Sequence, residues 1–474
     1  MADLIAYGTY VPRHRLERSS IGTALGSPAG KGRRAVAGYD EDATSMAVEA
    51  GRDALRAVGI DWALTRLLYA TASPPYLDKT NANVVHAALR LDPSALAVDM
   101  MGSVRSGVGA LLLAAETPGP TLAVLSDIRT GLPGSADERE GGDAAAAFVF
   151  ATEGEPIARV IAQASSTDEF LDRWRLPGAP ASRVWEERFG EHIYLPLADA
   201  AFADALKRAG VTPADVDVLV AAGTHGRAVK AFSAGSGVAR VADDLGATVG
   251  NAGTAQPGLL LANVLDQAGP GQTIAVVVLA DGATAVLLRV TEAITGYRRA
   301  KTVAAQVDSA NPSLRYADFL SWRGFLTKEP PRRPDPVGPA APPSHRSSHY
   351  KYGFVAHRCE ECGTVHLPAV RICVQCKATD RMVEVPMADQ LGTVATFAID
   401  HLAYSPSPPV IAAVVDFDGG GRFSCQLTDA DPAQVAIGDR VEMTFRRIIT
   451  ASGVHNYFWK ARPVAKPSAT AKEA

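Results

Sequence analysis

The chain has 474 residues, of which 47% are hydrophobic and 21% are charged, so it has enough apolar residues for two or three hydrophobic cores. Its 47 basic and 51 acidic residues nearly balance, which excludes a strong field for attracting nucleic acid or a membrane surface. Residues 2–8 read as a short buried strand rather than a signal peptide, and no uncharged apolar run reaches the roughly 18 residues that span a bilayer. We therefore expect a cytoplasmic protein.

The first part of the chain, up to about residue 290, alternates apolar β-branched runs such as 121–126 with Ala/Leu-rich amphipathic stretches. This pattern predicts an α/β layered domain. A faint internal repeat runs through it, because the pattern of residues 102–127 recurs in residues 250–281. We expect two similar halves, each with a buried helix that leads into a central strand.

Composition changes after about residue 325. Residues 316–326 predict a short amphipathic helix that docks on one of the domains. Residues 329–343 contain so many prolines that neither a helix nor a central strand is expected there, since the missing amides cannot donate hydrogen bonds. We expect an extended linker over residues 326–350.

The chain has five cysteines, and four of them form two CxxC pairs that ten residues separate, namely Cys359, Cys362, Cys373 and Cys376. Two such pairs supply four thiolates that can coordinate one zinc ion tetrahedrally. This spacing favours a structural zinc ribbon in residues 351–384, rather than a redox pair or free thiols. Gly363 allows the tight turn after the first pair. Four thiolates leave no open position on the metal, so the zinc is expected to fold the module and do no chemistry.

Three other residues near or after this cluster are expected to be structural. His357 and His366 flank the cysteines and could replace a ligand, but with four thiols present we interpret them as surface residues. Cys425 lies within an apolar run and reads as a small buried hydrophobic residue.

From residue 385 the sequence becomes rich in short β segments. A Gly-rich turn at 418–421 and a second turn at 437–439 separate some of these segments. Five segments fit a small closed barrel of the OB type over residues 385–463, namely 393–397, 410–415, 423–427, 440–445 and 456–460. Balanced charge argues against a nucleic-acid module, and residues 464–474 are expected to be disordered.

Motifs in both parts support a resemblance to known families. The order of zinc ribbon and OB barrel, with Tyr352-Gly-Phe-Val ahead of the cysteines, resembles the OB-fold family that partners thiolases and related acyl-CoA enzymes. Residues 39–50, 141–148 and 249–255 resemble the 3-hydroxy-3-methylglutaryl-CoA synthase branch of the thiolase superfamily, across about residues 1–325. This resemblance implies a thiolase-like two-half α/β/α/β/α domain and a coenzyme A thioester as ligand.

The catalytic positions that the resemblance implies do not carry the expected residues. Ala72 stands at the position of the acid/base glutamate, Val104 at that of the nucleophilic cysteine, and Ala222 near that of the histidine. No thiol lies in the first 358 residues, so a covalent acyl intermediate on cysteine is excluded there. His225, slightly further along, and Asn251, in the retained Gly-Asn motif, are the remaining candidates.

Each candidate also has a structural interpretation. His225 could reach a thioester carbonyl or could be a hydrogen-bonded structural histidine, and Asn251 could hold a carbonyl oxygen or cap a helix. Ser103 and Ser106 flank the lost nucleophile, and capping is favoured over attack because no base is evident. For Tyr76, packing is favoured over a phenolic acid role, and Asp143 and Asp281, in matching contexts of the two halves, favour structural roles.

Two functions follow as hypotheses. In the first, the chain is a non-catalytic or scaffold subunit that binds acyl-CoA beside a thiolase partner, as a homodimer, a heteromer, or both. In the second, it is a non-covalent acyl-CoA aldolase, lyase or acyltransferase that uses His225 and Asn251.

Overall fold

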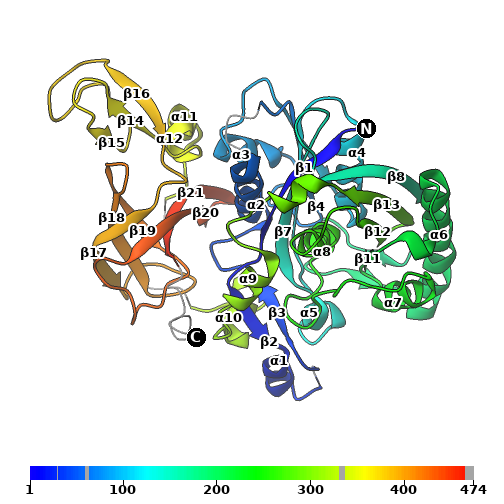
Figure 1. The fold of residues 1–474 in the computed structure, drawn as a ribbon. Helices are drawn as coiled ribbons and strands as arrows, with labels where there is room; N and C mark the ends of the chain where they lie inside the picture. The colour runs from blue at the N-terminus through cyan, green and yellow to red at the C-terminus, as the bar shows by residue number, and fades with distance from the viewer. Residues whose placement is uncertain (29, 59–62, 330–336, 465–474) are drawn as a thin grey trace, which may run out of the picture. The chain divides into compact units, whose positions relative to one another are not determined.

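The computed structural model describes residues 1–28, 30–58, 63–329 and 337–464 (Figure 1). The chain divides into two compact units, Met1–His86 with Leu91–Leu326, and Thr327–Ala474 with Ala87–Arg90. We call them the N-terminal and C-terminal domains. The residues expected to form a disordered tail lie, from 465 onward, outside the described residues.

The N-terminal domain is built on one mixed sheet of nine strands in the order β11-β12-β13-β8-β1-β7-β6-β4-β5. The chain begins with β1 (Asp3–Tyr10), as expected, because its residues alternate between two covered faces and are almost all buried. The other strands are β4 (Arg66–Thr71), β5 (Leu96–Met101), β6 (Thr121–Ile128), β7 (Asp143–Ala151), β8 (Ala158–Ser166), β11 (Val218–Gly223), β12 (Thr273–Leu279) and β13 (Ala283–Val290).

Strand pairing reveals the two similar halves that the repeat predicts. In the first half β4 pairs parallel with β6, β6 antiparallel with β7, and β7 antiparallel with β1. In the second half β11 pairs parallel with β12, β12 antiparallel with β13, and β13 antiparallel with β8. The counterpart of β5 is reduced to one parallel bridge between Leu219 and Val241.

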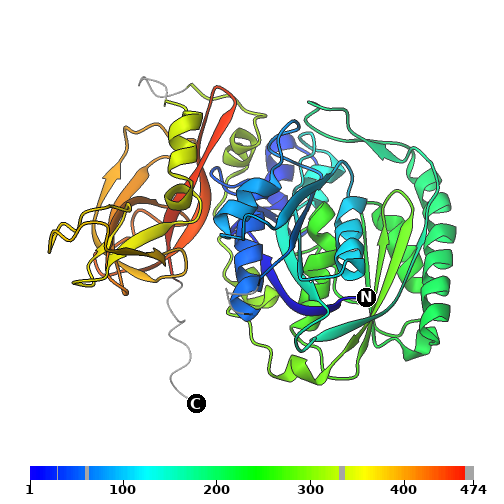
Figure 2. The same cartoon turned by 90° about the horizontal axis from the view of Figure 1, so that it is seen from above.

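Helices cover both faces of the sheet (Figure 2). The repeat supplies α4 (Arg105–Glu116) and α8 (Gln256–Leu265), whose apolar residues belong to one core with β1, β6, β7 and β12. Almost every residue of α8 is buried, which explains its continuous Leu-Leu-Leu run. α2 (Ala43–Val58) packs on β1 and β7, whereas α6 (Glu187–Ala209) and α7 (Gly226–Gly235) form a second core with β8, β11, β12 and β13. α4 and α8 share this first core with strands of both halves of the sheet, whereas α2 packs on the first half and α6 and α7 pack on the second, which gives the expected thiolase-like α/β/α/β/α layering.

The amphipathic helix before the linker docks as expected. It is α10 (Tyr316–Trp322), and Tyr316 and Phe319 pack in a small core of the N-terminal domain with Leu16, Ile21 and Val36. The domain also contains the following short elements: β2 (His14–Glu17), α1 (Arg18–Leu25), β3 (Arg33–Val36), α3 (Ala82–Ala88), α5 (Ala136–Glu140), β9 (Arg173–Trp174), β10 (Arg183–Val184) and α9 (Val303–Asp308).

In the C-terminal domain the proline-rich segment is partly helical, which corrects our expectation. α11 (Ala341–Arg346) begins inside it, and α12 (Ser348–Lys351) follows. Pro342 and Pro343 lie in the first turn of α11, where a helix leaves its amides unpaired in any case. Residues 330–336 of the expected linker lie outside the described residues.

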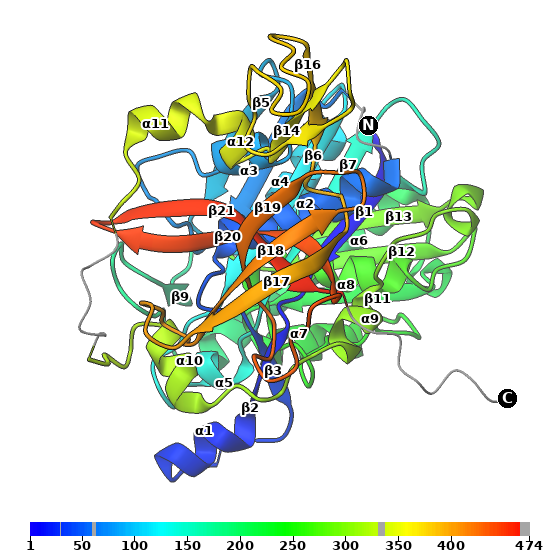
Figure 3. The same cartoon turned by 90° about the vertical axis from the view of Figure 1, so that its left-hand side faces the viewer.

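The ribbon and the barrel follow as expected. β14 (Val355–Cys359), β15 (Val365–His366) and β16 (Met382–Pro386) form a three-stranded sheet. Figure 3 shows the closed five-stranded barrel, in the order β17-β18-β19-β21-β20. Its strands are β17 (Gly392–Asp400), β18 (Val410–Phe417), β19 (Arg422–Leu427), β20 (Arg440–Ala451) and β21 (Val454–Pro463). Among the described residues, no helix combines the length and the apolar character needed to cross a bilayer.

Candidate functional site

The three positions at which the family resemblance implies catalytic groups are apolar and buried. Ala72 follows the end of β4, Val104 precedes α4, and Ala222 lies near the end of β11. They are 7%, 8% and 3% exposed. Methyl and isopropyl groups supply neither a nucleophile nor a proton donor, so these positions can only shape the site.

Asp127, near the end of β6, joins the turn after β4 to the segment before α8. It was not among the site residues expected from the sequence. Its fully buried carboxylate accepts a hydrogen bond of 2.5 Å from Ser73 Oγ and two of 3.1 Å from the amide and hydroxyl of Thr254. The group therefore ties the turn after β4 to the segment before α8. A buried acid that ends an apolar strand was the available signal.

His225 is held by backbone groups at both ring nitrogens. It is the N-cap of α7, with Nδ1 accepting from the Ala228 amide at 3.1 Å. Nε2 lies 2.9 Å from the Glu187 carbonyl oxygen, which can only accept. The ring is thus arranged as the neutral tautomer with its proton on Nε2, and both nitrogens are engaged in the structural role that we weighed above.

One acidic neighbour of His225 is notable. Asp172 is 2% exposed, and its Oδ1 has no hydrogen-bond partner in the described structure. A Cβ atom on Gly190 would lie 2.5 Å from Asp172 Oδ1 and 2.7 Å from His225 Nε2, so both atoms face the same glycine. Burial raises the pKa of Asp172.

Asn251 lies next to the same strand end. Its Nδ2 donates to the Gly223 carbonyl at 2.7 Å, and its Oδ1 accepts from the Gly253 amide at 2.9 Å. The structure thus brings Asn251 to the end of β11. Its contact there, Gly223, lies two residues before His225 in the chain. Asn251 Nδ2 retains a second hydrogen that no protein group described here accepts.

The remaining candidates of the N-terminal domain make local contacts. Ser103 Oγ accepts from the Arg105 amide at 3.2 Å, and Ser106 Oγ donates to the Met101 carbonyl at 3.4 Å, both beside the start of α4. Tyr76 is partly buried, and its backbone bonds the Asn81 side chain. Asp281 is exposed in the turn between β12 and β13. Ser103 thus bonds an amide at the start of α4, whereas Ser106 bonds a carbonyl and does not cap the helix.

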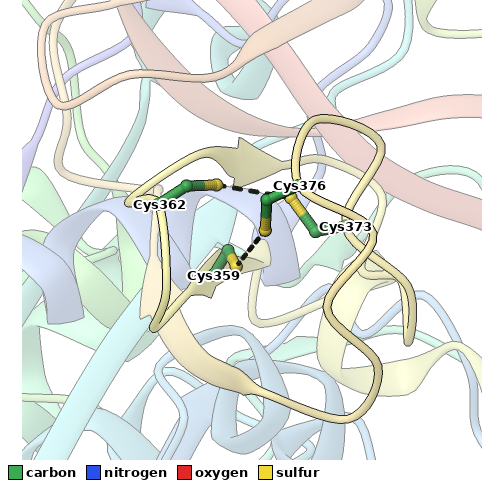
Figure 4. Close-up of side chains that lie close together, drawn as sticks. All are labelled: Cys359, Cys362, Cys373 and Cys376. Carbon is green, nitrogen blue, oxygen red and sulfur yellow. Dashed lines mark hydrogen bonds between the residues drawn. The ribbon is translucent and has the colours of Figure 1, made fainter.

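The four cysteines of the C-terminal domain gather at one point (Figure 4). Their sulfur atoms all lie within 4.8 Å of one another, with Cys359 Sγ 3.6 Å from Cys376 Sγ and Cys362 Sγ 3.5 Å from Cys373 Sγ. Zinc–sulfur bonds of about 2.3 Å in a tetrahedron require sulfurs roughly 3.8 Å apart, so the cluster fits the ion.

Both CxxC turns have the same backbone. The residue after the second cysteine of each pair is in the left-handed region, with φ of 73° at Gly363 and 64° at Lys377. Its amide donates to the carbonyl of the first cysteine, Cys359 or Cys373. Glycine meets this requirement without strain, whereas the second turn accepts a lysine there.

One of the two histidines that flank the cysteines differs from expectation. His366, expected at the surface, is 7% exposed, because β15 turns its ring inward, and its Nε2 has no hydrogen-bond partner in the described structure. His357 is partly exposed and bonds the Val370 carbonyl at 2.8 Å. Cys425 lies in β19 and is half-buried, and burial raises the pKa of its thiol to about 12.

Comparison with known proteins agrees with this architecture. The structure of MvaS in complex with 3-hydroxy-3-methylglutaryl coenzyme A has a TM-score of 0.56 at 17% identity, over 72% of this chain and 94% of that one. The fold therefore places the N-terminal domain in the thiolase-like class.

Sequence similarity then identifies the family. A hydroxymethylglutaryl-CoA synthase of Aeropyrum pernix is 30% identical over 356 residues, which cover 69% of this chain and 95% of that protein. The chain belongs to the hydroxymethylglutaryl-CoA synthase family. In this chain, a C-terminal OB-fold domain of the ChsH2 type follows the synthase-like domain.

Two findings concern this C-terminal part. The family model described as the ChsH2 C-terminal OB-fold domain matches residues 384–446. A DUF35 domain-containing scaffold protein of Methanocaldococcus jannaschii is 32% identical over 119 residues, which cover 24% of this chain and 84% of that protein.

Proposed function

We propose that the N-terminal domain binds an acyl-CoA thioester without forming an acyl-enzyme, and that the chain is a scaffold subunit beside a thiolase partner. The observation that carries this proposal is the set of apolar side chains Ala72, Val104 and Ala222 at the positions of the catalytic groups. A CoA ester could occupy such a site, but none of these three side chains could attack it.

Three further observations support the proposal. The backbone contacts of both ring nitrogens leave His225 no free nitrogen for proton transfer. A structural neighbour of the N-terminal domain is described in complex with a coenzyme A ester, and a relative of the C-terminal domain is described as a scaffold protein. The two domains thus combine a fold suited to an acyl-CoA ligand with one related to a scaffold.

Incubation with acetyl-CoA tests the absence of an acyl-enzyme. The intact mass of the protein should stay unchanged, because the N-terminal domain has no thiol to acylate. An added acetyl mass that maps to residues 1–358 would contradict the proposal. Pull-down from a lysate should recover a thiolase subunit, and addition of the chain should raise that thiolase's turnover of its CoA ester.

A second candidate function is a non-covalent acyl-CoA lyase or acyltransferase. The unpaired oxygen of Asp172 near His225 favours it, because a carboxylate can orient an imidazole and support its charge once the ring leaves its backbone contacts. Asn251 could hold the thioester oxygen through its second amide hydrogen. In this case His225 would carry the proton.

The variant His225→Ala separates the two functions. For a lyase, turnover should fall by about 10²-fold or more, whereas affinity for the CoA ester should change much less. For a scaffold, His225→Ala and Asn251→Ala should both support the partner enzyme at the wild-type rate. Wild-type rates in both variants would eliminate the lyase.

The C-terminal cysteines are proposed to hold one structural zinc ion. When bound, the metal would supply folding free energy to the ribbon and no reactive site, since Cys359, Cys362, Cys373 and Cys376 occupy all four positions.

Assembly is proposed to use the free edge of the sheet. β5 ends the sheet and pairs only with β4 among the described strands. Leu96 and Val98 on this edge are 56% and 36% exposed. An exposed apolar edge strand favours pairing with another chain, either a second copy or a thiolase subunit.

A further inference from the structure

The C-terminal domain contains a cavity that the proposed function does not use. Its volume is about 870 Å³, within the range of about 300–1,000 Å³ typical of small-molecule sites. Residues of the segment 339–351, which includes α11 and α12, form one wall, and residues of the barrel strands form the other. Aromatic and aliphatic side chains dominate the barrel wall, among them Phe397, Ala413, Phe423 and Phe458.

Lys351 is the one charged residue of this lining, whose polar members Ser344, Ser347, Thr396, Ser424, Gln426 and Asn456 are all uncharged. Its side chain lies at the end of α12 and is 8% exposed. Nζ donates to Ser344 Oγ at 3.1 Å, and it lies 5.3 Å from the centroid of the Tyr352 ring. Among the described residues no carboxylate pairs with it, and burial alone lowers the pKa of its ammonium group.

A buried cation without an anion is unfavourable, because it loses hydration and gains only a hydroxyl and a ring in return. Proteins retain such a group where a ligand supplies the missing charge. The neutral Ser344 and Tyr350 beside it in the same wall can donate further hydrogen bonds to an anion.

We propose that this cavity binds a small amphipathic monocarboxylate, with its apolar body against the barrel strands and its carboxylate on Lys351 Nζ. Every lining residue belongs to the C-terminal domain, so the site is separate from the acyl-CoA site proposed for the N-terminal domain and does not depend on it.

The chemistry of the wall selects this ligand class. A thioester or an alcohol carries no charge for Lys351 to neutralise. A phosphate carries close to two charges and is usually bound by several cations or by a bidentate arginine, whereas this lining has one lysine and no arginine. One ammonium group in an apolar cavity matches one carboxylate on an apolar body.

Calorimetric titration of the full-length protein with dodecanoate, below its micellar concentration, tests the site. We expect one dodecanoate per chain. Dodecanamide has the same length but no charge. Its affinity should be lower by about tenfold or more, because it forms no charge-assisted hydrogen bond. This comparison needs no variant.

Lys351→Met removes the charge and keeps an unbranched side chain that is one heavy atom shorter. It should weaken dodecanoate binding about tenfold or more and leave dodecanamide unchanged. Lys207→Met, which alters an exposed lysine of α6, is the matched control and should change neither affinity.

Three outcomes would overturn the proposal. They are failure of dodecanoate to bind the wild-type protein, equal binding of dodecanoate and dodecanamide, and unchanged binding of dodecanoate to Lys351→Met. Coenzyme A serves as a third titrant. Lys351-dependent binding of coenzyme A without binding of dodecanoate would assign the cavity to a nucleotide carrier instead.

Discussion

Asp143 shows how a single buried charge organises the N-terminal domain. Its side chain is fully buried and lies 3.4 Å from Arg34 Nη2, while its other oxygen pairs with Arg323. The amides of Ala37 and Arg129 also donate to it, at 2.7 and 3.0 Å. One carboxylate thus neutralises two guanidinium groups from distant parts of the chain, which supports the structural role expected from the sequence.

Removal of this charge should be costly. Asp143→Asn leaves Arg34 and Arg323 buried without an anion, and we expect a loss of about 3–5 kcal/mol in the free energy of unfolding. The matched control is Asp204→Asn, because Asp204 pairs with Arg208 at the surface, where side-chain exposures are 45% and 59%. Its loss should stay below about 1 kcal/mol. Urea denaturation of the N-terminal domain measures both, and equal losses would contradict this account.

At the scale of elements, α4 is placed by its close approach to the segment before α8. A Cβ atom on Gly107 would lie 2.3 Å from the Thr254 carbonyl oxygen, which only a shift of the helix could relieve. Two residues further along the same helix, a Cβ atom on Gly109 would have its nearest neighbour at 3.5 Å, an ordinary contact. Packing at Gly107 therefore fixes the first turn of α4, which begins at Arg105 directly after Val104.

These two glycines form a matched pair of tests. Gly107→Ala should destabilise the domain by about 1–3 kcal/mol, because it overpacks the helix against backbone. Gly109→Ala should stabilise it by about 0.5–1 kcal/mol, because alanine restricts the unfolded chain more than glycine does. Thermal unfolding compares them, and a stabilising Gly107→Ala would contradict the packing argument.

The ribbon gives a second prediction at this scale. Cys373→Ser should abolish the zinc content of about one ion per chain and unfold the ribbon, because the metal supplies most of its folding free energy. Metal analysis by mass spectrometry measures the content. Cys425→Ser is the control, since Cys425 lies in the barrel and not in the cluster, and it should retain the zinc. Undiminished zinc in Cys373→Ser would refute the site.

At the scale of the whole molecule, the sheet has two ends of different character. The edge at β11 is fully buried and is partly capped by the bridge from Leu219 to Val241. The other edge, β5, has exposed apolar side chains at Leu96 and Val98. Of the two edges of this nine-stranded sheet, the described residues leave β5 the more accessible to a strand from another chain.

A charge on this edge should prevent association. The wild-type protein should sediment at micromolar concentration as a dimer or with a thiolase subunit, and Val98→Lys should shift it to the monomer, since lysine on an edge strand opposes pairing. Leu25→Lys on α1, where Leu25 is 43% exposed, is the control and should leave the assembly intact. A monomeric wild type that captures no partner would exclude this interface.

The sequence by itself determined the features that depend on local spacing. Two CxxC pairs predicted the cysteine cluster, and alternating segments with Gly-rich turns predicted the closed barrel. The repeat of residues 102–127 in 250–281 predicted two matching halves. Turn chemistry and periodicity act within a few residues, so a single chain segment contains the information.

Only the tertiary structure decided the features that depend on contacts between distant residues. His225 caps α7 and bonds Glu187, 38 residues earlier in the chain, and Asp172 lies near the same imidazole. His366 is buried rather than exposed, and Lys351 lines an apolar cavity without an anion. No local pattern encodes these environments, because burial and hydrogen-bond partners are set when remote strands and helices pack together.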